Sequence, residues 1–325
     1  MDTRERNEGK KHPLKGMRVG IFGKGGTGKS TVSVLFAKEL AARGYDVYLL
    51  DADSTNVGLH RGLGLQAPPE PLIEYFGGMV FGGGAVTCPV DDPTPLPGSD
   101  LMMGELPSSY FRRSDENVVL MSGGKLGDFG PGAGCDGPIS KIARDVEIRG
   151  PQDHSLTLVD LKAGIEDFAR GVITKLDWIV VVVDPSLAAI QVAKSLATLV
   201  NQIQAGATPA TTHLEDPSLA ETAKRMYEEA RVKGVMAVLN RVPDRVTEMK
   251  MEGEISKEGL LHLIGALKED GSIRDAWLEG RSIESEENRD RVTRMVDRIE
   301  AAVADSSGLD PETVVDQRPA LRVPG

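Results

Sequence analysis

Short apolar runs alternate with stretches of helical spacing along most of the chain. Residues 178–184, with the sequence WIVVVVD, are apolar almost without interruption, which is expected of a central strand buried on both faces. The other runs are β-branched or aromatic and are bounded by glycine or polar residues. Strands are predicted on these criteria at residues 17–22, 45–51, 117–121, 156–160, 178–184, 234–239 and 260–267.

Stretches with an apolar residue at every third or fourth position separate these strands. Val32, Phe36 and Leu40 follow the first strand at this spacing, and Gly44 ends the stretch. Strands that alternate with helices form parallel sheets through right-handed crossovers. The pattern therefore predicts an α/β fold with a mostly parallel sheet of seven to eight strands and helices on both faces. Further helices are predicted at residues 138–146, 187–199, 217–232 and 284–303.

Three segments do not follow this pattern. Residues 1–16 are polar and without periodicity, so we expect a disordered arm, and residues 306–325 form a C-terminal tail. Residues 66–116 hold eight of the 19 prolines and two glycine clusters, which predicts little regular structure. We expect this insertion at the ligand-binding edge, as either a partner contact or a plain surface excursion.

Composition narrows the classes of function. Hydrophobic residues make up 40% and charged residues 27% of the chain, as in a globular protein. The net charge of −11 argues against nucleic acid as the main partner. The longest apolar run is too short to cross a membrane, and residues 1–15 lack the apolar segment of a signal peptide. With only Cys88 and Cys135, a fold built on several disulfides is excluded and a cytoplasmic location is expected.

Residues 23–30 read GKGGTGKS and fit the pattern G-x-x-x-x-G-K-[ST] of phosphate-binding loops in nucleoside triphosphatases. They lie between a predicted strand and a predicted helix, where backbone N–H groups and the helix dipole favour phosphate. We expect Lys29 to reach the β- and γ-phosphates and the Ser30 hydroxyl to bind Mg²⁺. The predicted nucleotide contacts are Gly23, Lys24, Gly25, Gly26, Thr27, Gly28, Lys29, Ser30 and Thr31.

Carboxylates end two of the predicted strands. Asp51 and Asp53 lie at the end of residues 45–51, and Asp160 ends residues 156–160. Because ligands of open α/β sheets bind at the carboxyl ends of the strands, we expect these side chains beside the phosphate loop. Asp51 and Asp160 would hold water around Mg²⁺, although the segment after Asp51 also suits a helix-capping turn. Gly164 would donate a backbone N–H to the γ-phosphate and act as a hinge.

Lys24, a second lysine in the loop, makes the pattern more distinctive. GKGGTGKS resembles the deviant phosphate loop of the MinD, ParA and nitrogenase iron protein superfamily of ATPases. The resemblance implies a single phosphate-loop NTPase domain over residues 17–305. It also implies that Lys24 reaches the phosphates bound by the partner subunit of a homodimer, and that Asp53 polarises the attacking water.

The resemblance continues toward the end of the chain. Asn240 and Arg241 follow the strand at 234–239, where the superfamily recognises the base, and an amide side chain can donate to and accept from adenine. The alternative is an ordinary turn. MinD proteins end in a basic membrane-binding helix, and residues 305–325 do not resemble one, so no membrane partner is expected.

Within the superfamily the sequence most resembles the CooC-like ATPases that insert nickel into carbon monoxide dehydrogenase. Residues 159–166 read VDLKAGIE, where CooC-like proteins have V-D-x-E-A-G-x-E, so Lys162 replaces an acidic residue. CooC-like proteins also carry C-x-C in a loop before a helix, where two subunits share one metal ion. Here only Cys135 matches, as a possible ligand for nickel or zinc at a dimer interface, or else as an unremarkable loop residue.

The resemblance implies a Mg²⁺-dependent ATPase that hydrolyses ATP to ADP and phosphate. It would alternate between an ADP-bound open and an ATP-bound closed homodimer, as an accessory factor for a client metalloenzyme. Two alternatives use the same nucleotide chemistry. One is a ParA- or MinD-like positioning ATPase. The other is an electron donor like the nitrogenase iron protein, which would need two cysteines per subunit for its bridging cluster.

Overall fold

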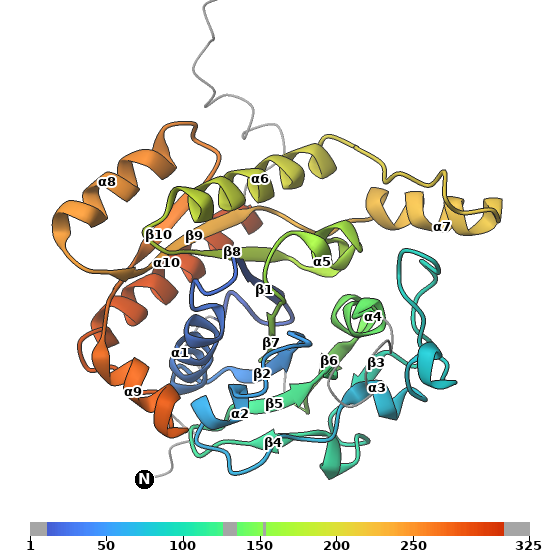
Figure 1. Cartoon of the computed structure of the whole chain (residues 1–325), viewed down its shortest axis with the longest axis horizontal. Helices are drawn as coiled ribbons and strands as arrows, with labels where there is room; N and C mark the ends of the chain where they lie inside the picture. Colours follow the sequence, from blue (N-terminus) through green and yellow to red (C-terminus); the bar gives the residue numbers. More distant parts are fainter. Residues whose placement is uncertain (1–11, 126–134, 152–153, 309–325) are drawn as a thin grey trace, which may run out of the picture.

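The centre of the molecule is an eight-stranded sheet with helices on both faces (Figure 1). The structure is a computed structural model that describes residues 12–125, 135–151 and 154–308. Neighbouring strands pair in parallel except at one edge, where β4 runs antiparallel to β5. The spatial order is β10 (His262–Lys268), β9 (Val235–Val242), β8 (Trp178–Val183), β1 (Arg18–Gly23), β7 (Ser155–Asp160), β2 (Asp46–Asp51), β5 (Val119–Ser122) and β4 (Arg112–Arg113).

The buried strands explain why two helical layers are needed. Along β8, Ile179, Val181 and Val183 face one apolar core, while Val180 and Val182 face the other. One layer covers the first core and contains α4 (Gly137–Asp145), α6 (Leu187–Gln204) and α8 (Arg245–Ser256). The opposite layer contains α1 (Lys29–Ala42), α2 (Leu59–Gly62), α9 (Gly271–Glu279) and α10 (Arg289–Gly308).

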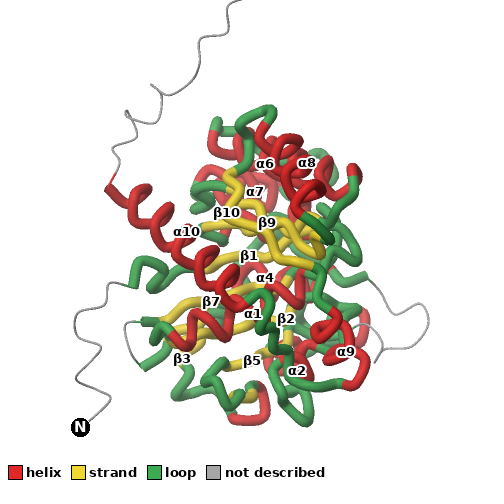
Figure 2. The backbone as a smooth tube through the Cα atoms, turned by 90° about the vertical axis from the view of Figure 1, so that its left-hand side faces the viewer, coloured by secondary structure: helices red, strands yellow, loops and turns green. Residues whose placement is uncertain are grey.

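The order of the strands creates the place for a ligand. From β1 the chain continues to β2 on one side and later to β8 on the other, so the sheet reverses its direction of growth at β1. In Figure 2 the labelled strands run from β10 and β9 through β1 and β7 to β5. Ligands of such sheets bind beyond the carboxyl ends of the strands at this switch point. The loop after β1 therefore lies in the expected crevice.

The insertion at residues 66–116 packs along α4. It contains α3 (Leu72–Tyr75), two short 3₁₀ segments at Val80–Gly82 and Ser108–Tyr110, and β3 (Asp100–Met102), which pairs with β6 (Glu147–Arg149). Its buried apolar residues join the core on the α4 side of the sheet. Two short elements complete the α4 layer, α5 (Glu166–Ala169) and the 3₁₀ segment Val172–Lys175, and α7 (Pro217–Glu228) lies beside the insertion at one end of the molecule (Figure 1).

Several boundaries differ from the predictions. Residues 12–16 are not part of a disordered arm, because they form a turn in which Leu14 is buried against Tyr45. The helix α8 was not predicted, since its apolar residues are too few for a clear period. The helix α6 continues to Gln204, and α10 starts later and ends later than predicted. The described residues do not include the predicted arm at 1–11, the glycine-rich segment 127–134 or the tail from 309.

Candidate nucleotide-binding site

The phosphate loop, residues 23–30, contains two glycines whose positions exclude any larger residue. Gly23 has φ +153°, and a Cβ added there would lie 2.6 Å from the carbonyl oxygen of Val182. Gly28 has φ +89°, and a Cβ there would lie 2.2 Å from Nδ2 of Asn240. Both φ values favour glycine. The loop therefore fits closely between β8 and the end of β9.

The N-terminus of α1 is left open toward the site. Its N-cap is Gly28, which offers no side-chain acceptor, and its first turn has no acidic residue. Free N–H groups at a helix N-terminus bind anions well. Lys29 adds a positive charge and is only 6% exposed. By contrast, α6, α7, α8 and α9 are each capped by a side chain, from Ser186, Asp216, Asp244 and Asp270.

Asp160 is fully buried and is held by two hydroxyl groups of the first helix. Its Oδ2 accepts a hydrogen bond from Ser30 Oγ at 2.7 Å, and its Oδ1 accepts one from Ser33 Oγ at 2.8 Å. Burial raises the pKa of Asp160, while these two hydrogen bonds oppose the rise. Asn56, which the sequence analysis missed, donates to Ser30 Oγ at 2.8 Å. The Ser30 hydroxyl is thus fixed from both sides.

Asp51 lies next to Asp160 in the register of β2 and β7, and Lys125 contacts it. The Lys125 ammonium donates to Asp51 Oδ2 at 2.8 Å and to the carbonyl oxygen of Asp53 at 2.6 Å. Burial raises the pKa of Asp51 to about 7, against the lowering effect of Lys125. Lys125 was also missed, because its contact with Asp51 depends on how β5 pairs with β2.

Asp53 forms a turn with the next residues and also faces the site. Its Oδ1 accepts hydrogen bonds from the backbone N–H of Thr55 at 2.9 Å and from the Thr55 hydroxyl at 2.7 Å. The capping-type turn proposed as the alternative is therefore present. Asp53 also lines the cavity beside Ser30, and its action on the attacking water stays a prediction.

The residues predicted to bind magnesium form a suitable set of donors. Ser30, Asp51 and Asp160 present hydroxyl and carboxylate oxygens, the donors that Mg²⁺ prefers. Asp51 Oδ1 is buried without a hydrogen-bond partner, so it has capacity to accept from a metal-bound water. These residues fit a magnesium ion held directly or through water. An ion bound there would neutralise phosphate charge.

A cavity of about 590 Å³ opens over the phosphate loop. Asn240 lines it and donates from Nδ2 to the carbonyl oxygen of Thr27 at 2.7 Å. Arg241, with φ +57°, donates to the carbonyl oxygen of Gly26 at 2.8 Å. The contact with a base stays a prediction, but both side chains hold the loop in shape. The lining is Gly26, Gly28, Lys29, Ser30, Thr31, Asp53, Asn56, Asn240, Arg241, Lys268, Glu269, Asp270, Ile273, Arg274 and Trp277.

The far wall of the cavity is built by α9. Trp277 donates from Nε1 to the Thr31 hydroxyl at 2.9 Å and packs close to Gly58 and Gly62. It therefore joins α9 to α1 and α2. Trp277 was not among the predicted site residues, although it is one of only two tryptophans in the chain.

Gly164 contacts the loop itself and not the cavity. Its N–H donates to the carbonyl oxygen of Gly23 at 3.1 Å, and its φ is +100°. Contact of this N–H with a γ-phosphate, as predicted, requires that the bond to Gly23 break. The segment after Asp160 is thus tied to the phosphate loop in this structure.

Lys24 and Cys135 lie outside the cavity. The side chain of Lys24 is half-buried and contacts no hydrogen-bonding or ionic partner within the described part of the chain. Cys135 is exposed. Over residues 12–125, 135–151 and 154–308, no group of three or more His, Cys, Asp or Glu side chains is arranged to hold a metal ion. The soft-metal site at Cys135 stays a prediction.

A buried ionic cluster connects the site to α4. Asp136, the residue before α4, pairs with Lys162 and with Arg170, the latter at 2.8 Å. The Ser54 hydroxyl donates to the same carboxylate at 3.3 Å. Burial opposes ionisation of Asp136, but Lys162 and Arg170 outweigh it and lower its pKa. The segments that follow β2 and β7 therefore both contact the start of α4.

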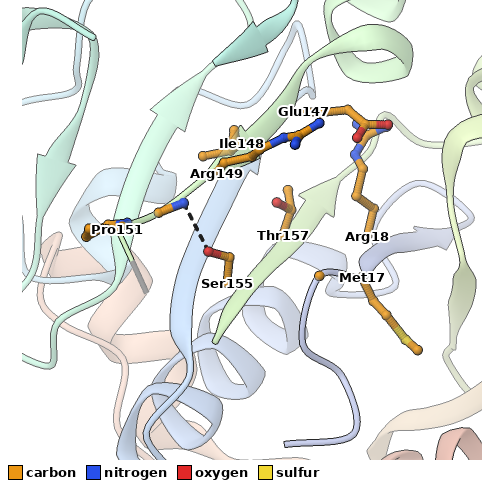
Figure 3. Close-up of a pocket in the computed structure, with 10 residues that line it drawn as sticks. Met17, Arg18, Glu147, Ile148, Arg149, Pro151, Ser155 and Thr157 are labelled. Atoms are coloured by element: carbon orange, nitrogen blue, oxygen red, sulfur yellow. Dashed lines mark hydrogen bonds between the residues drawn. The ribbon is translucent and has the colours of Figure 1, made fainter. Parts of the chain in front are cut away.

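A second cavity, of about 480 Å³, lies at the amino ends of β1 and β7 (Figure 3). It is lined by Met17, Arg18, Ser155 and Thr157 and by residues of β6. The Arg18 guanidinium donates to the carbonyl oxygens of Arg144, Lys175 and Ala143. This cavity is at the opposite end of the strands from the phosphate loop and takes no part in the site.

Comparison with known proteins agrees with this geometry. Residues 21–318 match the family model described as the CobQ/CobB/MinD/ParA nucleotide binding domain. The chain belongs to this family. It is 35% identical, over 182 residues, to an uncharacterized ATP-binding protein of Methanocaldococcus jannaschii, covering 55% of this chain and 72% of that protein.

Two further proteins are similar at lower identity. The carbon monoxide dehydrogenase accessory protein CooC of Rhodospirillum rubrum is 28% identical over 204 residues, covering 58% of this chain and 70% of that protein. The septum site-determining protein MinD of Pyrococcus horikoshii, solved with Mg-ADP, superimposes with a TM-score of 0.55 at 14% identity. That superposition covers 90% of this chain and 99% of MinD, and it shows that the two folds are alike.

Proposed function

We propose that the protein is a Mg²⁺-dependent ATPase. The observation that carries this proposal is the open N-terminus of α1 with Lys29 buried beside it, where Ser30 donates to Asp160 of β7, next to Asp51 of β2. Backbone N–H groups and Lys29 would bind the phosphates, and Ser30, Asp51 and Asp160 would hold the metal. Asp53 would orient the attacking water.

We further propose that ATP closes a homodimer. Lys24 has no partner in the described part of the chain, which leaves its ammonium available for the phosphates held by a second subunit. A cation that stabilises charge in the transition state can increase the rate by about 10³ to 10⁵. ADP would leave the dimer open, because the Gly164 N–H then stays on Gly23. The γ-phosphate would compete for that N–H.

The biological role that we propose is that of an accessory factor for a metalloenzyme. The similarity to CooC over 70% of that protein supports it, together with the VDLKAGIE segment at residues 159–166. In such a role, hydrolysis changes the shape of the dimer and the client protein responds. The insertion along α4 offers a surface for that contact, because Tyr75, Val80 and Phe81 are exposed.

Substitution of Lys29 tests the nucleotide function. Lys29→Ala removes the charge that faces the β- and γ-phosphates, so ATP hydrolysis and ATP-induced dimerisation should both disappear. Phosphate release and light scattering after size exclusion measure the two effects. Lys250→Ala, at an exposed position of α8, is the control and should behave like wild type. Hydrolysis at the wild-type rate by Lys29→Ala would refute the proposed site.

A further inference from the structure

The two cysteines of the chain come together in the fold although they are far apart in the sequence. Cys88 belongs to the insertion, and Cys135 immediately precedes Asp136 and α4. The Cys88 side chain lies against the first residue of α4, because a Cβ added at Gly137 would be 2.4 Å from Cys88 Sγ. Gly137 follows Cys135 by two residues, a span of at most about 7 Å.

Hydrogen bonds fix Cys88 at this position. The backbone N–H groups of Asp91 and Asp92 donate to the carbonyl oxygen of Cys88 at 3.1 and 2.9 Å, which closes a turn. Lys141 of α4 then donates to Asp92 Oδ2 at 3.0 Å and to the Thr87 hydroxyl at 3.3 Å. The turn that carries Cys88 is therefore bound to the same helix that Cys135 precedes.

The two thiols differ in exposure. Cys135 is exposed, whereas Cys88 is 7% exposed. Burial raises the pKa of Cys88, and the nearby charge of Cys135 raises it further. Burial lowers the pKa of Arg170, but the charges of Asp136 and Asp167 raise it above its usual value. The two thiols add to this rise, so both lie near the Arg170 guanidinium. An oxidant in solution can reach Cys135 directly, whereas Cys88 is shielded and lies against the start of the helix that Cys135 precedes.

We propose that Cys88 and Cys135 form an intramolecular disulfide when the protein meets hydrogen peroxide, which joins the insertion covalently to the start of α4. Peroxide first oxidises the Cys135 thiol to a sulfenic acid and releases one water. The Cys88 sulfur then attacks the Cys135 sulfur. The S–S bond forms, the S–O bond breaks, and the hydroxide leaves with the Cys88 proton as a second water. Two thiols lose two electrons and two protons, and one peroxide is reduced.

The position of this bond gives it a consequence for the nucleotide site. Asp136, directly after Cys135, holds Lys162 and Ser54 through its carboxylate. A disulfide at Cys135 restrains the residue next to this contact. Oxidation would therefore limit how far the segments after β2 and β7 can move relative to α4.

Peptide mapping tests the bond directly. The full-length protein is reduced, treated with hydrogen peroxide, alkylated and digested with trypsin without reductant. In the monomeric fraction we expect fragment 62–112, which contains Cys88, linked to fragment 126–141, which contains Cys135. Dithiothreitol should release the two fragments. In Cys88→Ser or Cys88→Ala, dimedone should instead trap Cys135 as the sulfenic acid. In Cys135→Ser, the Cys88 thiol should remain free after peroxide treatment and should be fully alkylated.

Two results would overturn the proposal. One is a Cys135–Cys135 link between two molecules in place of the internal link. The other is wild-type protein in which Cys135 is trapped by dimedone to the same extent as in Cys88→Ala. The mapping needs no nucleotide, so its outcome is independent of whether the protein hydrolyses ATP.

Discussion

At the scale of single residues, the site depends on a few side chains that are held in place by other residues of the chain. Ser30 is held between Asp160 and Asn56, and Asn240 fills the space that the absent side chain of Gly28 leaves. Such fixed geometry reduces the reorganisation needed when charge develops on a phosphate. Lys24 differs from these residues, since its side chain has no such restraint in the described structure.

Lys24→Ala should therefore separate binding from hydrolysis. If Lys24 acts on the partner's phosphates, the substitution should lower the rate of hydrolysis by about 10³-fold or more and weaken nucleotide binding only modestly. Steady-state phosphate release and the fluorescence of a labelled ATP measure the two quantities. Hydrolysis at the wild-type rate would show that the cross-subunit role is wrong.

At the scale of elements, α4 connects the insertion to the nucleotide site. Its N-terminus contacts the segments after β2 and β7 through Asp136. The insertion packs along the rest of the helix. Arg144 and Asp145 form a buried ion pair at its C-terminus, and Asp145 also accepts from the backbone N–H of Leu96 at 2.9 Å. The insertion is therefore packed against α4, and its regular structure is limited to short elements, as its prolines and glycines predicted.

The contact between Lys141 and Asp92 should make stability depend on pH. Burial alone would raise the pKa of Asp92, but hydrogen bonds from Thr94 and Lys141 lower it to about 2, from 3.8. The ionised carboxylate therefore stabilises the fold above about pH 4, and this contribution is lost as the pH falls toward 2.

Asp92→Asn measures this contribution. The substitution should reduce the free energy of unfolding by about 1 kcal/mol at pH 7, a value lowered by solvent screening, since the Asp92 side chain is 33% exposed. The difference from wild type in urea unfolding should shrink at about pH 3. Asp91→Asn, at the exposed neighbouring position, should have no such effect. A difference that stays constant with pH would contradict the ion pair.

The stability of the protein should also be sensitive to the size of the side chain at position 137, the first residue of α4. In Gly137→Ala the new Cβ would meet Cys88 Sγ at 2.4 Å and Cys88 Cβ at 2.7 Å. Overpacking of this kind costs about 1–3 kcal/mol of unfolding free energy. Gly253→Ala is the matched control, because nothing lies within 4 Å of its added Cβ and alanine favours the helix by about 0.5–1 kcal/mol. In urea unfolding, the free energy of unfolding should fall in Gly137→Ala and rise in Gly253→Ala. Equal stability of Gly137→Ala and wild type would argue against the packing of Cys88 on Gly137.

At the scale of the whole molecule, exposed apolar residues gather around the carboxyl ends of the strands. Val57 is 75% exposed after β2, Ile165 44% after β7, and Leu187 67% at the start of α6. Together they flank the phosphate loop. Exposed apolar groups at one edge favour a protein–protein contact. None of the described helices is long and apolar enough to cross a membrane.

Leu187→Asp tests whether this edge is the dimer interface. An acidic residue in the first turn of α6 suits the helix dipole, so the fold should be unaffected. A buried charge at the interface should weaken the ATP-dependent dimer at least about tenfold, as measured by light scattering with a non-hydrolysable ATP analogue. Met102→Asp, at an exposed apolar position on β3, is the control. A dimer of unchanged strength in Leu187→Asp would place the interface elsewhere.

The sequence by itself determined the features that depend on neighbours along the chain. Apolar runs of strand length and helical spacing between them were enough for the parallel α/β sheet. The phosphate loop could also be predicted from the sequence, because its glycines, Lys29 and Ser30 lie within eight consecutive residues. Asp51, Asp53 and Asp160 could be placed at one edge because the carboxyl ends of parallel strands always meet there.

Only the tertiary structure decided which distant side chains complete these features. Lys125 contacts Asp51 through the pairing of β5 with β2, and Trp277 contacts Thr31 through the packing of α9 on α1. Leu14 is buried by its contact with Tyr45, and Cys88 meets the start of α4 because an irregular insertion folds along that helix. These contacts follow from crossovers and packing, which have no period in the sequence, and so residue spacing alone did not predict them.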